Sequence, residues 1–83
     1  MFTIKAASDL TEVPVATLRA WERRYGIALP MRTETGYRVY DDRALEEIRM
    51  MQELITQGWA PKQAADAVLR HRRSQPSTFD TIE

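Results

Sequence analysis

The stretch TLRAWERRYG, residues 17–26, constrains the fold more than any other part of this 83-residue chain. It combines three arginines, a tryptophan and a tyrosine, and its only glycine stands at its end. Pro14 precedes it, and proline fits the first turn of a helix because that turn needs no amide donor. Gly26 is the residue type that commonly ends helices. The pattern predicts one unbroken helix from residue 14 to residue 25.

The two flanks of this helix differ in chemistry on a wheel of about 100° per residue. The apolar flank, which we expect to face the core, consists of Val15, Leu18, Trp21 and Tyr25, with Glu22 at its edge. The polar flank consists of Ala16, Thr17, Ala20, Arg23 and Arg24, with Arg19 at its border. Small alanines between long cationic side chains let the helix backbone approach another surface. We expect Glu22 to pair with Arg19 or with an arginine of the following segment.

Three further helices are predicted from apolar spacing and capping residues. The first spans residues 3–9 or 3–10, with Thr3 as its N-cap. The third opens at Asp41 or Asp42 and ends near residue 57, before Gly58. The fourth begins at Pro61 and fades near residue 72.

The inner positions of these later helices follow from the same spacing. The predicted core residues are Ala44, Leu45, Ile48, Met51 and Ile55 in the third helix and Ala64, Ala65, Val68 and Leu69 in the fourth. Met50 and Leu54 lie off the inner stripe and indicate a second, smaller apolar contact. We expect Trp59 to pin the turn between the two helices.

Residues 31–40, MRTETGYRVY, have two short extended arms around Glu34, Thr35 and Gly36. A glycine in such a connection favours a β-hairpin. We expect Tyr40 in the core and Tyr37 near the hairpin tip. The predicted fold is mainly α with this short β-hairpin: a winged helix-turn-helix of four helices plus a wing in residues 1–73. Residues 74–83 are expected to be a disordered tail or the stump of a linker.

The formal net charge is zero, but the charges are unevenly distributed. Residues 14–40 contain five arginines and two glutamates, an excess of three positive charges. Residues 41–60 contain two arginines and five carboxylates, an excess of three negative charges. A basic half can attract phosphates over a Debye length of roughly 8 Å at physiological salt. The alternative is that the two halves simply neutralise each other.

Several classes of function are disfavoured. The absence of cysteine excludes disulfides and cysteine-based zinc sites, and the single His71 is expected to be a solvated residue near a helix end rather than a metal ligand. No apolar run approaches the roughly 20 residues that span a bilayer, and the N-terminus lacks the pattern of a secretory signal. We therefore expect a cytoplasmic protein with no membrane partner.

Catalysis is also disfavoured. The sequence has no glycine-rich phosphate loop and no cysteine nucleophile, and its serines have only His71 as a base. Glu46 and Glu47 are adjacent in sequence, which is typical of a solvated helix face rather than of two carboxylates across a cleft. We expect no enzyme activity.

The order of these features resembles the DNA-binding domain of MerR-type transcription regulators. The resemblance rests on the helix-turn-helix, on TLRAWERRYG, on the hairpin motif R-T-x-x-G-Y-R-V-Y and on the helix pair that follows, and it covers residues 3 to about 70. The form LRAWERRYG at residues 18–26 is most similar to the cobalamin-dependent, light-responsive branch of CarA, CarH and LitR. In that branch cobalamin binds a separate C-terminal domain, so no cofactor is expected in this chain.

The resemblance implies a regulator, here expected to be a repressor, that binds inverted-repeat operators in double-stranded DNA as a dimer. The second helix would enter the major groove and the hairpin would contact the neighbouring minor groove or backbone. The implied recognition-helix contacts are Thr17, Arg19, Arg23, Arg24 and Tyr25, and the implied wing contacts are Arg32, Tyr37 and Arg38. Lys62, in the first turn of the fourth helix, is expected to make a weaker contact with the DNA backbone.

Two departures from the family pattern affect these expectations. Glu12 stands where the family commonly has glycine, so the turn either places a non-glycine residue in left-handed geometry, at roughly 1–2 kcal/mol, or is built differently. The long dimerisation helix of the family is also missing. The chain is then either a domain of a longer regulator or a small stand-alone member that dimerises only on DNA.

Two other functions remain open from the sequence. The chain could be a protein-interaction module whose basic face binds an acidic protein, or whose Met50 and Leu54 contact another domain. An acidic antagonist could also compete with DNA for the basic face. Alternatively, the chain could be an excisionase-like architectural factor that binds DNA during recombination.

Overall fold

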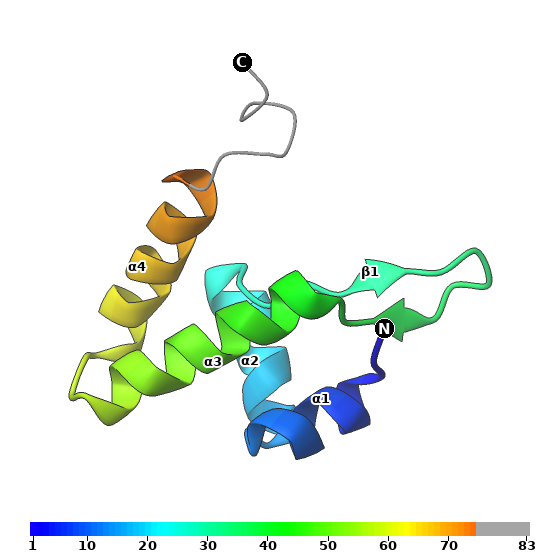
Figure 1. Cartoon of the computed structure of the whole chain (residues 1–83), viewed down its shortest axis with the longest axis horizontal. Coiled ribbons are helices and arrows are strands. Elements are labelled where there is room, and N and C mark those ends of the chain that lie inside the picture. The colour runs from blue at the N-terminus through cyan, green and yellow to red at the C-terminus, as the bar shows by residue number, and fades with distance from the viewer. Residues whose placement is uncertain (75–83) are drawn as a thin grey trace.

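The computed structural model describes residues 1–74, which form four helices and one antiparallel hairpin (Figure 1). The elements are α1 (Ile4–Thr11), α2 (Val15–Tyr25), β1 (Met31–Arg32), β2 (Arg38–Val39), α3 (Asp42–Thr56) and α4 (Pro61–Ser74). The hairpin extends away from the helices in Figure 1. This arrangement confirms the predicted winged helix-turn-helix. The tail expected at residues 74–83 lies outside the described residues, except for Ser74 at the end of α4.

The helix starts follow from local capping, as predicted. The Thr3 hydroxyl oxygen accepts a hydrogen bond from the Ala6 amide at 3.1 Å, and the Asp41 carboxylate accepts one from the Ala44 amide at 2.9 Å. These bonds satisfy amide groups that have no partner within the helix. Pro14 differs slightly from the prediction, because it is the N-cap of α2 and the helix itself begins at Val15.

The turn between α1 and α2 contains a non-glycine residue in left-handed geometry. This is one of the two predicted possibilities for this turn. Glu12 adopts φ 61° and ψ 27°, and its amide donates to the Ser8 carbonyl oxygen at 2.7 Å. The Ser8 hydroxyl in turn donates to the Val13 carbonyl oxygen at 2.6 Å. Hydrogen bonds therefore hold a conformation that a non-glycine residue adopts at a cost.

The hairpin pairs Met31 with Val39 and Arg32 with Arg38, and the turn between the strands includes Gly36 at φ 88°. Tyr40, which follows β2, forms a separate bridge with Phe2: its amide donates to the Phe2 carbonyl oxygen at 2.6 Å, and its carbonyl oxygen accepts from the Phe2 amide at 2.9 Å. The sequence did not predict this bridge. It ties the N-terminal segment to the base of the wing.

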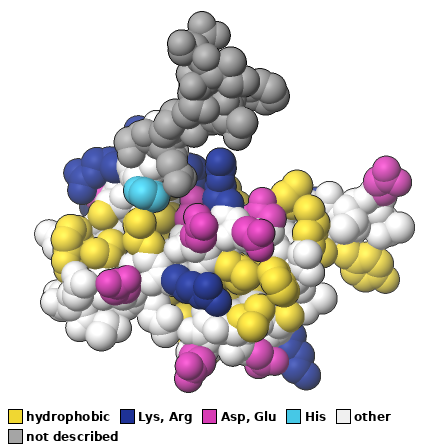
Figure 2. Space-filling model, in the orientation of Figure 1, with side chains coloured by type: hydrophobic (Ala, Val, Ile, Leu, Met, Phe, Trp, Pro, Cys, Tyr) yellow, Lys and Arg dark blue, Asp and Glu magenta, His cyan; other side chains and the backbone are white. Residues whose placement is uncertain are grey.

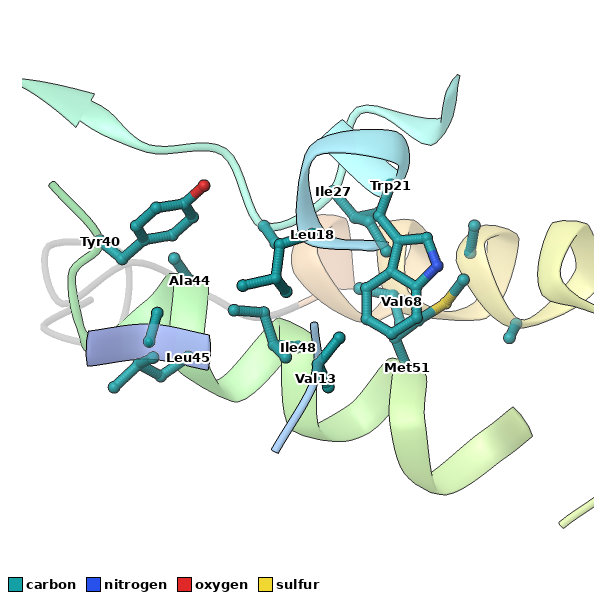
Figure 3. Packing of buried hydrophobic residues seen from close by; sticks show 14 residues of the cluster. Val13, Leu18, Trp21, Ile27, Tyr40, Ala44, Leu45, Ile48, Met51 and Val68 are labelled. Carbon is teal, nitrogen blue, oxygen red and sulfur yellow. The ribbon is translucent and has the colours of Figure 1, made fainter. Parts of the chain in front are cut away.

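The core lies between α2 and α3 and is closed by α4. Figure 3 shows Leu18 and Trp21 of α2 pointing toward Ile48 and Met51 of α3. Full burial of each aliphatic side chain of this size stabilises the fold by about 1.5–3 kcal/mol. The buried set also includes Ala7, Val13, Ile27, Ala28, Tyr40, Ala44, Leu45, Ala64, Ala65 and Val68. Among residues 1–74, no helix has the length and apolar character needed to cross a membrane.

The prediction for Glu47 is wrong. Its side chain is buried rather than part of a solvated acidic face, because it accepts hydrogen bonds from α4 and from the loop after α2. Met50 and Leu54 are partly buried and pack against the main core. Trp59 is 40% exposed, and its amide donates to the Leu54 carbonyl oxygen at 3.0 Å in the turn before α4.

Candidate nucleic-acid interface

Helix α2 separates an apolar flank from a cationic one. Leu18 is fully buried and Trp21 is 8% exposed, so these two side chains fix the rotation of the helix about its axis. Arg19, Arg23 and Arg24 are exposed. The predicted division of the helix into two faces is confirmed, whereas the DNA contacts of its arginines stay a prediction.

The remaining predicted residues of α2 are less exposed than its arginines. Thr17 is half-buried, and Tyr25 is half-buried and packs against the core. Arg24 does not line the space between α2 and the wing, where Arg19 and Arg23 lie. The five predicted contacts of this helix therefore do not form one uniform cluster.

The wing carries cationic and aromatic side chains on a short two-stranded hairpin. Arg32 and Arg38 are exposed and stand directly opposite each other in the antiparallel ladder. Like charges in directly opposed positions destabilise a sheet. Tyr37 is 72% exposed beside the turn, as predicted. An anion bound at this pair would relieve the repulsion between the two guanidinium groups.

Helix α2 and the wing meet around a shallow hollow of ≈ 400 Å³, which we call the interface hollow. Its lining residues are Arg19, Glu22, Arg23, Leu29 and Arg38. Glu22 lies 3.7 Å from the guanidinium of Arg38 and has a side chain 23% exposed. The fold therefore brings two arginines of the helix and one of the wing to the same place, and it confirms the predicted pairing of Glu22 with a wing arginine.

Tyr40 lies beneath this charged group and is 1% exposed. Burial raises the pKa of its phenol above the ordinary 10.0, and the negative charge of Glu22 raises it further. Arg38 and Arg19 act in the opposite direction on this pKa. A buried tyrosine thus supports the surface that carries the arginines.

Lys62 lies apart from the interface hollow. It is exposed in the first turn of α4, which Figure 1 places at the opposite end of the molecule from the wing. If Lys62 contacts DNA, the contact is therefore separate from those of α2 and the wing.

The two charge excesses lie on different elements. The basic excess belongs to α2 and the wing, and the acidic excess belongs to α3 and its N-cap Asp41. Figure 2 shows acidic side chains on the face that α3 crosses, whereas α2 lies behind α3 in this view. Among residues 1–74, no group of three or more histidine, cysteine or acidic residues could hold a metal ion.

Sequence reasoning missed an ion pair next to this surface. The Nε and Nη2 atoms of Arg72 donate to the two carboxylate oxygens of Glu47, each at 2.6 Å. The hydrogen bond to Glu47 raises the pKa of Arg72 despite the opposing effect of burial. The available signal was spacing: Glu47 lies three residues after Ala44, and Arg72 lies four after Val68, so each shares a face with a core residue.

Comparison with known proteins identifies the family of this fold. Residues 2–70 match the MerR HTH family of regulatory proteins. The chain belongs to this family. MerR HTH regulators bind DNA, which agrees with the exposed arginines of α2 and the wing.

The MerR-family relatives are transcription regulators by name. The chain is 42% identical to the transcriptional repressor CarH of Myxococcus xanthus over 64 residues, which cover 77% of this chain and 21% of CarH. It is 45% identical over 53 residues to the repressor CarA of the same organism, covering 63% of this chain and 18% of CarA. Identity to the regulator MlrA of Escherichia coli is 38% over 58 residues, or 70% of this chain and 24% of MlrA. The matched segments thus span less than a quarter of each relative.

Proposed function

We propose that this chain is the DNA-binding domain of a MerR-type transcription regulator, with α2 in the major groove and the hairpin as a wing on the adjacent backbone. The observation that carries the proposal is the interface hollow. There Arg19 and Arg23 of α2 meet Arg38 of the wing, while Leu18 and Trp21 hold the helix from the other side. A rigid helix with cationic side chains on one face suits the major groove, which admits one α-helix.

The arginines are expected to divide their roles. An arginine fork can bond the O6 and N7 atoms of a guanine at once, which is worth about 1–3 kcal/mol of discrimination against a wrong base. Half to two-thirds of protein–DNA hydrogen bonds nevertheless go to phosphate and sugar. We therefore propose that one of Arg19, Arg23 and Arg24 reads a base and that the other two contact phosphates.

The wing is proposed to bind the DNA backbone. Arg32 and Arg38 would grip phosphates or enter a narrow minor groove, and the Tyr37 hydroxyl would donate to the backbone. Thr17 and Tyr25 would add contacts from α2, and Lys62 a weaker one from α4. The support for the wing contacts is the exposure of all three side chains on one short hairpin.

At the level of the whole regulator, we propose repression in the cytoplasm through a dimer on an inverted-repeat operator. The names of CarH and CarA as repressors support this choice. Binding of cobalamin in a separate C-terminal domain remains a prediction from the same branch of the family. Competition by an acidic protein for the cationic surface and an architectural role in recombination remain the alternatives.

Selection from a pool of randomised duplexes tests the proposal. The chain is expected to enrich a defined sequence, which then serves as the specific probe, with its scrambled version as the control probe. Arg23→Ala is expected to weaken binding to the enriched duplex more than to the scrambled one, whereas Lys62→Ala weakens both alike. Failure to enrich any sequence would overturn sequence-specific binding.

A further inference from the structure

We infer that Glu47 and Arg72 are positioning residues for DNA recognition, because they tie the loop between α2 and the wing to α3 and α4. The inference rests on the proposed function. We call the group formed by the Glu47 carboxylate, the Arg72 guanidinium, the Gly26 carbonyl and the Ala28 amide the loop clamp. Through it, the position of α4 determines how the end of the recognition helix and the base of the wing are held.

The loop clamp joins three parts of the chain through side-chain hydrogen bonds. Glu47 accepts from the Ala28 amide at 2.9 Å and from two nitrogens of Arg72 at 2.6 Å each. Arg72 also donates to the Gly26 carbonyl oxygen at 3.2 Å. The side chains of Glu47 and Arg72 are 9% and 28% exposed. Because hydrogen bonds between charged groups are strong and directional when water is largely excluded, the clamp fixes the loop in one position.

The loop needs such support because of its backbone. Gly26 and Ala28 have φ of 68° and 54°, so two of three consecutive residues are left-handed. Ala28 is a non-glycine residue in this region, and it is fully buried. Backbone conformations of this kind persist only where the surroundings hold them in place. The hydrogen bonds to the Gly26 carbonyl and the Ala28 amide hold these two left-handed residues in place.

Leu29 connects the loop clamp to the DNA-facing surface. It follows Ala28 directly and lines the interface hollow together with Arg19, Arg23 and Arg38. It also lines a second hollow of ≈ 200 Å³ with Glu47 and Arg72. A displacement of the loop would therefore alter the wall between the arginines of α2 and the arginine of the wing.

A movement of α4 would disrupt the loop clamp and so affect the recognition helix. Arg72 lies in the last turn of α4, whereas Gly26 ends the recognition helix. A tilt of α4 that withdraws Arg72 would remove the donor to the Gly26 carbonyl and free the Glu47 carboxylate. The interface arginines would stay charged and exposed, but their relative placement would no longer be held. Sequence-specific binding is thus more sensitive to the clamp than nonspecific attraction to phosphate.

The test uses two conservative substitutions with neighbours as matched controls. Arg72→Lys keeps the charge but loses the fork that reaches both Glu47 oxygens and the Gly26 carbonyl. Glu47→Gln keeps an acceptor for the Ala28 amide but loses the charge. Arg73→Lys and Glu46→Gln make the same chemical changes at exposed positions next to each. All four variants are measured below their unfolding temperatures, with folding checked by circular dichroism.

The first readout needs no DNA. In the amide NMR spectrum of the free chain, Arg72→Lys and Glu47→Gln are expected to shift the signals of Gly26, Ala28 and Leu29 and to propagate to Arg23 and Arg38. The two control variants are expected to leave these signals in place. A spectrum of Arg72→Lys identical to that of Arg73→Lys in this region would overturn the inference.

The second readout is affinity for the enriched duplex and for its scrambled version. Arg72→Lys is expected to lower affinity for the enriched duplex about tenfold, as for the loss of one aligned base contact, and affinity for the scrambled duplex by less. Arg73→Lys, which makes the same chemical change at the exposed neighbouring position, is expected to leave the ratio of the two affinities unchanged. An unchanged ratio in Arg72→Lys would overturn the inference even if amide signals shift. Absence of any duplex binding by the unmodified chain would instead overturn the proposed function and this inference with it.

Discussion

At the scale of single residues, the strongest energetic consequence comes from the buried pair of Glu47 and Arg72. Their guanidinium and carboxylate groups form two hydrogen bonds of 2.6 Å in a largely enclosed position. Removing one partner of such a pair leaves the other charge buried without compensation, whereas replacing both by neutral groups is often tolerated.

Arg72→Met is therefore expected to lower the free energy of unfolding by about 3 kcal/mol, measured by urea denaturation. We expect a loss at the lower end of the range for buried ion pairs, because the Arg72 side chain is 28% exposed. Adding Glu47→Gln to Arg72→Met is expected to restore part of the loss, because the amide still accepts from the Ala28 N–H and carries no charge. Additive losses from the two substitutions would contradict this account of the pair.

Tyr40 gives a pH-dependent prediction. Since burial raises its pKa above 10.0 in the folded chain, the folded state keeps its proton at pH values where the unfolded state loses it. This contribution to stability is complete below pH 10.0 and is lost as pH rises through the raised pKa. The alkaline decline in unfolding free energy is expected to be weaker in Tyr40→Phe. Tyr37→Phe, which removes an exposed phenol, is the control and is expected to keep the decline of the unmodified chain.

What the sequence predicts at this scale depends on the range of the interaction. The caps at Thr3 and Asp41 were predictable because each bond spans three residues. The pairing of Glu47 with Arg72 was not, because the two lie 25 residues apart and the spacing that places each on the core side of its helix does not indicate which residue it contacts. Ala28 was missed for a similar reason: its left-handed backbone is held by a side chain 19 residues away.

At the scale of elements, the turn between α1 and α2 is short and strained. Glu12 occupies left-handed geometry at φ 61°, which glycine adopts without steric cost. Glu12→Gly is expected to raise the free energy of unfolding by about 0.5–1 kcal/mol, because relief of the strain exceeds the added flexibility of the unfolded chain. Thermal unfolding followed by circular dichroism measures the change.

Asp9→Gly is the matched control for this turn. Asp9 is exposed within α1, where glycine is expected to lower stability by about 1 kcal/mol. A loss of stability in both variants would show that the turn at Glu12 is not strained.

The wing carries its own prediction. Arg32→Ala and Arg38→Ala are each expected to reduce the slope of log K against log salt for duplex binding by about 0.9 if each arginine neutralises one phosphate. Arg32→Ala also relieves the repulsion across the ladder, so the stability of the fold is not expected to fall in that variant, whereas Arg38→Ala additionally removes the ion pair with Glu22. Arg49→Ala, at an exposed position of α3, is the control. Wing variants with the slope of the unmodified chain would assign phosphate binding elsewhere.

The elements themselves were largely predictable, because helix and hairpin signals are local. The backbone pairing at the base of the wing was not predictable from the sequence. Phe2 pairs with Tyr40 through two backbone hydrogen bonds across 38 positions of the chain, and no side-chain pattern at Phe2 indicates a strand. The wing is therefore anchored by the N-terminal segment as well as by its own turn.

At the scale of the whole molecule, the zero net charge hides an uneven distribution of charge among the elements. The sequence predicted this division because the basic and acidic residues are grouped along the chain, and the fold keeps the two groups on different elements. It could not show that Arg19, Arg23 and Arg38 line one hollow, because that depends on how the loop after α2 returns. We propose that this surface binds duplex DNA and reads its sequence.

Equilibrium titration of the chain with the enriched and scrambled duplexes at two salt concentrations tests both DNA binding and sequence reading. The expected result is tighter binding to the enriched duplex at both salts and a slope of roughly −4 in log K against log salt, as for the four to five phosphates assigned to two arginines of α2, the two wing arginines and Lys62. Equal affinity for both duplexes would contradict sequence reading, and no binding to either at low salt would contradict DNA binding itself.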